Sequence, residues 1–175
     1  MKILKIVLCV IVLLIVFGVI IMKGFINCVE ETKEPKEVVI DGSGDKKALI
    51  IYQDSKFGTT NKATMALANK LKEEGYTVII NYPSDKINYN IEDYEVVALG
   101  SPVYAGQVSK ALLSYLENTD LNNKKVFAFV TGANEDNSAA LKLIKDKIKG
   151  SSKIVEASIN AKDVDNITSY VKELS

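Results

Sequence analysis

The sequence contains no histidine and no tryptophan, and all of its basic residues are lysines, because none of the 175 residues is arginine. Without histidine, imidazole acid–base catalysis and histidine ligation of a metal are excluded, and we expect no metal site. Without arginine, a phosphate group cannot be held by a bidentate guanidinium. Any phosphate site must therefore use backbone amides, hydroxyl groups and lysine side chains.

Cysteine is scarce and confined to the N-terminal part of the chain, at Cys9 and Cys28. The remainder of the sequence can therefore form no disulfide bond and offers no thiol nucleophile. Acidic and basic residues balance at 22 each, so the chain has no net charge that would attract nucleic acid. We expect no nucleic-acid partner.

One long apolar run occurs, from Ile3 to Met22, and it is interrupted only by Lys5. At about 1.5 Å per residue, a helix of this run spans roughly 30 Å, the hydrocarbon thickness of a bilayer. Residues 1–24 therefore predict a transmembrane anchor and a single-pass membrane protein. A cleaved signal peptide is the competing interpretation, although no small-residue cleavage site follows the run.

Lysines flank the apolar run on both sides in nearly equal number, and those after Lys23 lie farther from it. We therefore expect the N-terminus to lie inside and the following domain outside the cytoplasm. Residues 25–46 are charged and rich in turn formers, with one short apolar patch at Val38-Val39-Ile40. This composition predicts a linker, which places the domain at residues 47–175.

In the domain, short apolar runs alternate with segments of helical periodicity. The runs predict five strands, at 49–51, 76–80, 96–99, 126–130 and 154–159. The periodic segments predict helices at 63–71, 108–116, 138–149 and 164–174. Strands that alternate with helices indicate an α/β fold, with a doubly wound five-stranded parallel sheet covered on both faces.

The first strand ends in the loop Ser55-Lys56-Phe57-Gly58-Thr59-Thr60, and a helix follows. The loop offers three hydroxyl groups, a glycine and the free amides of a helix start. Those donors and the positive end of the helix dipole suit a phosphate. The alternative is an ordinary turn between strand and helix, capped by a threonine.

Two further loops are rich in small and polar residues, and they follow the third and fourth strands. The first, Gly100 to Gly106, contains Tyr104, whose ring could lie over a flat ligand. The alternative is that Tyr104 is a partly exposed loop aromatic without such a role. The second loop begins at Thr131-Gly132. Because ligands of such sheets lie beyond the carboxyl ends of the strands, the loops indicate one common site.

These loops resemble those of flavodoxins and related flavodoxin-like domains, which bind FMN. The resemblance covers Lys46 to about Ser175, and it implies the strand order 2-1-3-4-5. It implies that the loop from Ser55 to Thr60 binds the FMN phosphate and that the loop from Ser101 to Gly106 flanks the isoalloxazine. It also implies that residues 131–137 close over the other side of the isoalloxazine. The cofactor-binding residues that the resemblance implies are Ser55, Lys56, Phe57, Gly58, Thr59, Thr60, Ser101, Pro102, Val103, Tyr104, Ala105, Gly106, Thr131 and Gly132. No catalytic side chain is implied, because the flavin carries the chemistry.

The resulting hypothesis is a membrane-anchored FMN-binding protein that transfers electrons or reduces a small acceptor such as a quinone. It would be an FMN-dependent oxidoreductase or a non-enzymatic electron carrier, with a redox protein or a quinone as its partner. The alternative is a flavin-free domain that serves as a membrane-tethered binding module. Asp54, a carboxylate directly before the phosphate loop, and the lack of an aromatic residue in 131–137 favour this alternative.

Overall fold

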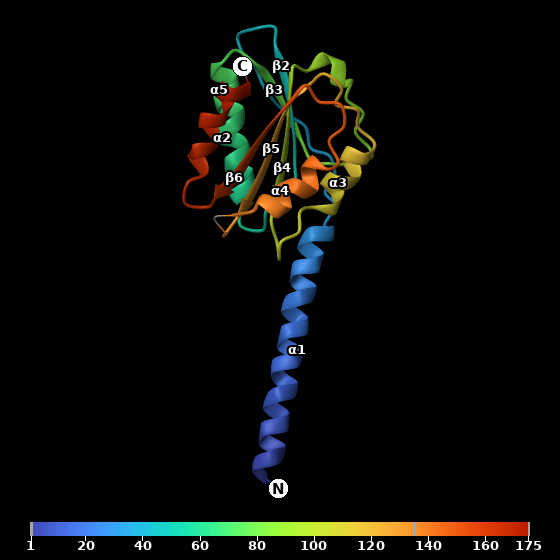
Figure 1. Ribbon diagram of the computed structural model, residues 1–175, viewed down its shortest axis with the longest axis vertical. Coiled ribbons are helices and arrows are strands. Elements are labelled where there is room, and N and C mark those ends of the chain that lie inside the picture. The colour runs from blue at the N-terminus through green and yellow to red at the C-terminus, as the bar shows by residue number, and fades with distance from the viewer. Residues whose placement is uncertain (1, 135, 175) are drawn as a thin grey trace.

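The computed structural model describes residues 2–134 and 136–174, except for the side chain of Phe25. The expected anchor, third loop and domain include Met1, Glu135 and Ser175, which lie outside the described residues. An apolar helix, α1 (Lys2–Glu30), extends away from an α/β domain (Figure 1). It is long and apolar enough to span a bilayer. It continues past residue 24 because no proline interrupts it, so the helix runs without a break up to the domain.

The domain is built on one six-stranded sheet in the order β1-β3-β2-β4-β5-β6. The strands are β1 (Val38–Ile40), β2 (Lys47–Tyr52), β3 (Thr77–Asn81), β4 (Val96–Pro102), β5 (Lys125–Gly132) and β6 (Lys153–Asn160). The strands from β2 to β6 pair in parallel, which confirms the expected five parallel strands and the order 2-1-3-4-5. Leu49, Ile50 and Ile51 of β2 are fully buried, as a strand covered on both faces requires.

The sixth strand, β1, was not predicted, because it lies in the segment 25–46 that the sequence analysis assigned to a linker. It pairs antiparallel with β3, and Val38 stands opposite Ile80. Pairing satisfies the backbone groups at the outer edge of β3, and Ile40 packs against the core. A strand of three residues is too short to show a periodic pattern, so the apolar patch alone could not distinguish it from a linker.

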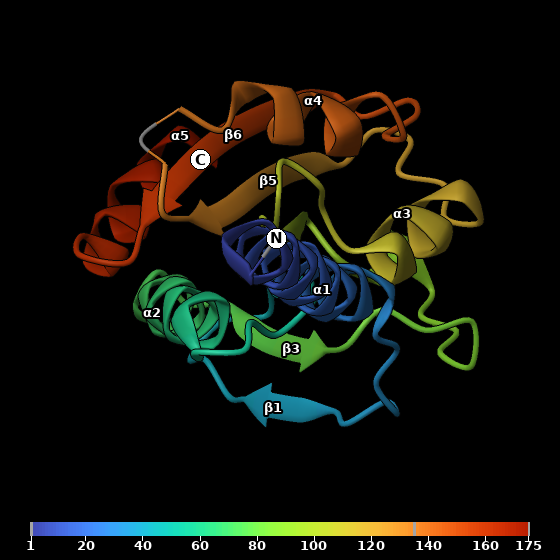
Figure 2. The ribbon, with the colours of Figure 1, turned by 90° about the horizontal axis from the view of Figure 1, so that it is seen from below.

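Helices cover both faces of the sheet (Figure 2). On one face lie α2 (Thr59–Glu73), the 3-10 helix η2 (Val164–Tyr170) and α5 (Val171–Leu174). On the other face lie the 3-10 helix η1 (Ile91–Asp93), α3 (Lys110–Glu117) and α4 (Ser138–Lys145). The expected last helix, 164–174, is thus mainly a 3-10 helix. Its β-branched residues and Asn166 are weak α-helix formers, which accounts for the difference.

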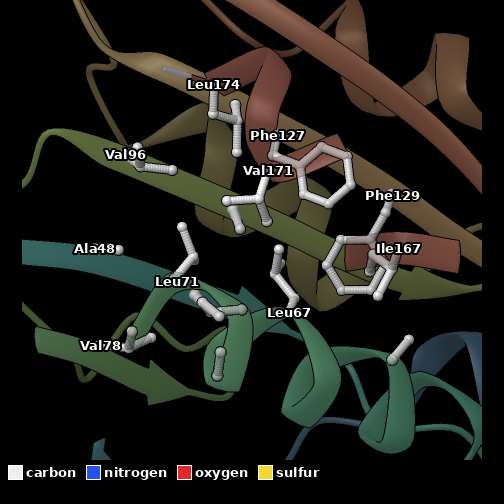
Figure 3. Close-up of a cluster of buried hydrophobic side chains, with 14 of the residues drawn as sticks. Ala48, Leu67, Leu71, Val78, Val96, Phe127, Phe129, Ile167, Val171 and Leu174 are labelled. Atoms are coloured by element: carbon white, nitrogen blue, oxygen red, sulfur yellow. The ribbon is translucent and has the colours of Figure 1, made fainter. Parts of the chain in front are cut away.

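The core on the first face joins α2 and the C-terminal helices to the sheet (Figure 3). Leu67 and Leu71 of α2 lie in the same cluster as Phe127 and Phe129 of β5, and Ile167 of η2 closes it. The two phenylalanine rings stack with centroids 5.6 Å apart. Because burying each such side chain contributes about 1.5–3 kcal/mol, this cluster holds α2 in place at the end of β2.

Gly100 of β4 lies directly beneath the ring of Phe129. A Cβ atom at this position would lie 2.3 Å from Cζ of that ring, well inside van der Waals contact. The glycine therefore allows the ring to pack closely on β4 where the predicted loop from Gly100 to Gly106 begins.

Replacing Gly100 with alanine should push this ring out of place and lower the free energy of unfolding by about 1–3 kcal/mol, as overpacked cores do. Urea unfolding of the full chain in mild detergent, followed by tyrosine fluorescence, would measure the loss. The double variant Gly100→Ala with Phe129→Leu should cost less than the sum of the single variants, because the smaller side chain makes room. Additive losses would contradict this account of Gly100.

Candidate functional site

The three predicted loops follow β2, β4 and β5, which are consecutive neighbours in the sheet. Because these strands are parallel, their carboxyl ends meet at one edge of the domain. The loops lie at the end of the domain from which α1 extends (Figure 1). The structure therefore brings the three loops together, as the strand order predicts.

The loop after β2 is a tight turn that leads into α2. Gly58 adopts the left-handed conformation, with φ 71°, and its amide donates to the carbonyl of Ser55 at 2.9 Å. The hydroxyl of Ser55 accepts a hydrogen bond from the amide of Thr60 at 3.1 Å. Within the described residues, the amides of Phe57 and Thr59 donate no hydrogen bond. Such unpaired donors at a helix start provide the elements of an anion site.

The loop after β4 is shaped by a tight turn from Tyr104 to Gln107. The backbone groups of these two residues exchange hydrogen bonds of 3.0 and 2.9 Å. Between them, Ala105 and Gly106 both have positive φ, 50° and 78°, the conformation of a two-residue hairpin turn. Ala105 and Gly106 are exposed, whereas Tyr104 is half-buried. The turn thus places its two small residues outward and its aromatic residue against the domain.

Ser101 and Pro102 are buried at the base of this loop. The Ser101 hydroxyl donates to the Pro102 carbonyl at 2.9 Å and accepts from the amide of Ser109 at 2.9 Å. The amide of Val103 donates to the carbonyl of Thr131 at 2.8 Å. These two predicted residues at the base of the loop therefore hold its shape from inside.

Tyr104 connects the second loop with the first. Its hydroxyl accepts a hydrogen bond from the amide of Lys56 at 2.7 Å. Burial raises the pKa of Tyr104, and the negative charges of Asp54 and Glu31 add to the rise. The phenol therefore keeps its proton at neutral pH, and its hydroxyl can donate a hydrogen bond while it accepts one.

The loop after β5 is joined to the start of α2 through a pair of buried hydroxyls. Oγ1 of Thr60 and Oγ1 of Thr131 lie 2.7 Å apart. Gly132 follows, and the side chain of Asn137 packs against it. Nδ2 of Asn137 donates to the carbonyl of Asn134 and to Oγ of Ser158, both at 2.9 Å. The loop thus closes on itself through Asn137, which the sequence analysis did not single out.

Two polar residues lie between β2 and the phosphate loop; the sequence analysis missed Gln53 and noted Asp54 only as a carboxylate directly before the loop. Gln53 is fully buried, and its Nε2 atom has no hydrogen-bond partner in the described residues. Oδ1 of Asp54 is also buried without a hydrogen-bond partner in the described residues. Buried polar atoms without partners are rare in folded proteins and mark places where a ligand or water completes the structure. In the sequence, the position of these residues at the end of a buried strand was the feature that could have indicated them.

Asp54 is paired with a lysine that sequence spacing could not have located. Nζ of Lys33 lies 3.2 Å from Oδ2 of Asp54. Burial lowers the pKa of Lys33, but the hydrogen bond and the charge of Asp54 outweigh it, so the pKa is raised overall. The carboxylate beside the phosphate loop is therefore balanced by a cation from the segment that follows α1.

Phe57, a predicted cofactor-binding residue, is exposed over 82% of its surface. A large cavity of about 860 Å³ lies elsewhere, between Thr32, the segment 83–92 and α3. None of its lining residues belongs to the three predicted loops. The loops are joined to one another by the contacts of Lys56 with Tyr104, of Thr60 with Thr131, and of Val103 with Thr131.

The free amides, the left-handed glycine and the hydroxyls of this edge fit a phosphate-bearing group, and a half-buried tyrosine stands beside them. Among solved structures, the chain is similar to oxidised flavodoxin 1 from Bacillus cereus, with 17% identity and a TM-score of 0.58 over 74% of this chain and 97% of that one. It is also similar to a flavoprotein in complex with FMN from Lactobacillus acidophilus NCFM, with 14% identity and a TM-score of 0.55 over 75% and 99% of the two chains. At such identities these likenesses show a shared fold.

Sequence comparison adds a relative and a family. An uncharacterized protein of Methanocaldococcus jannaschii is 31% identical over 105 residues, which are 59% of this chain and 66% of that protein. The chain thus spans just under two thirds of this relative. The family model described as the flavodoxin domain matches residues 49–168, from β2 into η2. This match includes all three loops and most of the chain, and the chain therefore belongs to the flavodoxin family.

Proposed function

We propose that this protein binds FMN at the three loops and passes electrons to or from a partner while tethered to a membrane. Membership of the flavodoxin family supports a flavin as the cofactor. The choice of FMN depends chiefly on one observation, the unpaired amides of Phe57 and Thr59 at the start of α2. A flavin without a phosphate would leave these donors unused.

The residues take separate roles in this proposal. Ser55 to Thr60 bind the phosphate through amides and hydroxyls. Val103 to Gly106 flank the isoalloxazine, with the Tyr104 ring beside it and with Ser101 and Pro102 supporting the loop from inside, and Thr131 and Gly132 lie on its other side. When bound, a flavin supplies oxidation–reduction chemistry in steps of one or two electrons. The protein binds and orients it, so no side-chain nucleophile is needed.

The electron partner is a redox protein or a lipid-soluble acceptor such as a quinone. The length and apolar character of α1 support a membrane anchor. Tethering raises the effective concentration of the domain near partners in the same membrane. We place the domain outside the cytoplasm because of the distribution of lysines around the apolar helix.

A second candidate function is a flavin-free binding module. The hydrogen bond from the Lys56 amide to the Tyr104 hydroxyl favours it, because one donor of the phosphate loop is already engaged. Asp54 also places a carboxylate directly before the loop, although Lys33 balances its charge. Flavin titration distinguishes the two functions.

The full chain in mild detergent should quench the fluorescence of FMN with a dissociation constant in the micromolar range or below. Riboflavin, which lacks the phosphate, should bind at least about tenfold more weakly, because charge-assisted hydrogen bonds contribute about 1.5–3 kcal/mol. Fluorescence titration with both ligands measures this ratio. If a chain that is shown to be folded quenches the fluorescence of neither flavin, the proposal of FMN binding is wrong and the flavin-free binding module is favoured.

Replacing Tyr104 with phenylalanine should tighten FMN binding by about 2- to 10-fold, because the phosphate no longer competes with the hydroxyl for the Lys56 amide. Riboflavin binding should not change, since it has no phosphate and the ring is kept. The matched control is Tyr170→Phe, which removes a hydroxyl from a ring stacked on Phe127. Weaker FMN binding by the Tyr104 variant would instead mean that the hydroxyl itself holds the phosphate.

Replacing Lys33 with glutamine should leave the Asp54 carboxylate unbalanced and weaken FMN binding by about 2- to 5-fold, the range for a partly exposed ion pair. Riboflavin should be unaffected, and added salt should reduce the difference. Lys36→Gln, at an exposed position of the same segment, is the control. In an Asp54→Asn background, the Lys33 substitution should have no effect. An equal loss for both flavins would show that Lys33 acts through structure and not through charge.

A further inference from the structure

The edge of the domain that carries the three loops is also the edge from which α1 extends, and it is called the cofactor edge below. Figure 1 shows the loops after β2 and β4 reaching toward the helix from the lower end of the domain, and Figure 2 shows α1 projecting from this edge. The opposite edge of the domain carries the C-terminal end of α2. If α1 spans a bilayer, as proposed above, the loops face the lipid surface and the far end of α2 faces water.

The distance between the loops and the lipid follows from the length of the helix. The apolar run ends at Met22, and α1 continues to Glu30, which adds about 12 Å at 1.5 Å per residue. The headgroup layer on each side of a bilayer is roughly 5–8 Å thick. The domain thus begins just beyond the headgroups, and loops that extend back toward the helix reach into them.

The junction between the helix and the domain is held by side chains on both sides. Val29 at the end of α1 is 8% exposed, whereas the apolar residues that precede Met22 are exposed along the helix. Glu30 forms an ion pair with Lys110 at the start of α3. Lys33 pairs with Asp54 beside the phosphate loop. These contacts join the end of α1 and the segment that follows it to the edge of the domain that carries the loops.

Phe57 provides an apolar side chain that can contact the headgroup region. It lies in the first loop, and with 82% exposure it is by far the most exposed large apolar side chain of the described domain, ahead of Val39 at 49%. Exposing an apolar ring to water is unfavourable, and phenylalanine is among the residues that bury their apolar surface at the boundary between headgroups and acyl chains. At this exposure the ring adds little to the packing of the phosphate loop.

We propose that the cofactor edge of this domain rests on the surface of the bilayer, with the Phe57 ring inserted among the lipid headgroups. The surface that Phe57 meets is lipid and not a protein. This inference rests on the proposed membrane anchor, and it narrows the redox partner to one that reaches the loops from the membrane, such as a lipid-soluble acceptor.

The absence of native tryptophan allows a direct test with single tryptophan reporters. The variant Phe57→Trp places the reporter at the proposed contact. The control, Lys72→Trp, places it at an exposed position in the last turn of α2, at the opposite end of the domain. Each full chain is reconstituted into phosphatidylcholine vesicles with or without a lipid that carries a nitroxide on its headgroup. Vesicle flotation and FMN quenching are measured on the same samples.

The emission of the Phe57→Trp variant should fall by about twofold or more when the nitroxide lipid is present, because interfacial aromatic rings lie at headgroup depth. The Lys72→Trp variant should not change. If both variants float with the vesicles and neither is quenched, or both are quenched equally, the proposed contact is overturned while the membrane anchor stands. A chain that does not float overturns the anchor and the contact together. FMN binding is judged separately by the titration, so its failure is distinguishable from either result.

Discussion

The burial of the parallel sheet on both faces is the constraint on which the rest of this structure depends. Strands such as β2 are apolar and buried from their second residue onward, so each face needs a cover of helices. Once α2, η2 and α5 cover one face and α3 and α4 the other, only the ends of the strands remain for binding. Three loops with small and polar residues meet at the carboxyl end. The location of the site is thus a consequence of how the core is formed.

The loops are organised by a few contacts between residues that are distant in the sequence. The Tyr104 hydroxyl reaches the Lys56 amide, and the buried hydroxyls of Thr60 and Thr131 meet. Each contact joins a loop to its neighbour. An acceptor already stands at the Lys56 amide, where a phosphate oxygen would also bind in the proposed function. Binding of FMN would then be coupled to the position of the tyrosine ring.

The segment after α1 forms specific contacts with the domain. It supplies β1, which completes one edge of the sheet, and Lys33, which balances the carboxylate of Asp54. The segment after α1 is consequently part of the same structural unit as the edge that carries the three loops. In the proposed membrane-anchored protein, these contacts would leave the three loops open to a partner on the membrane side.

The sequence by itself determined the apolar helix, the five parallel strands, their order by family resemblance, and the three loops. Each of these depends on patterns that are local in the chain, such as the run that begins at Ile3 or the loop from Ser55 to Thr60. Only the tertiary structure decided that Val38–Ile40 forms a strand, that Lys33 faces Asp54, and that α1 joins the domain at its cofactor edge. These features pair residues far apart in the chain. Their energies come from contacts made after the core has formed, which no local pattern records.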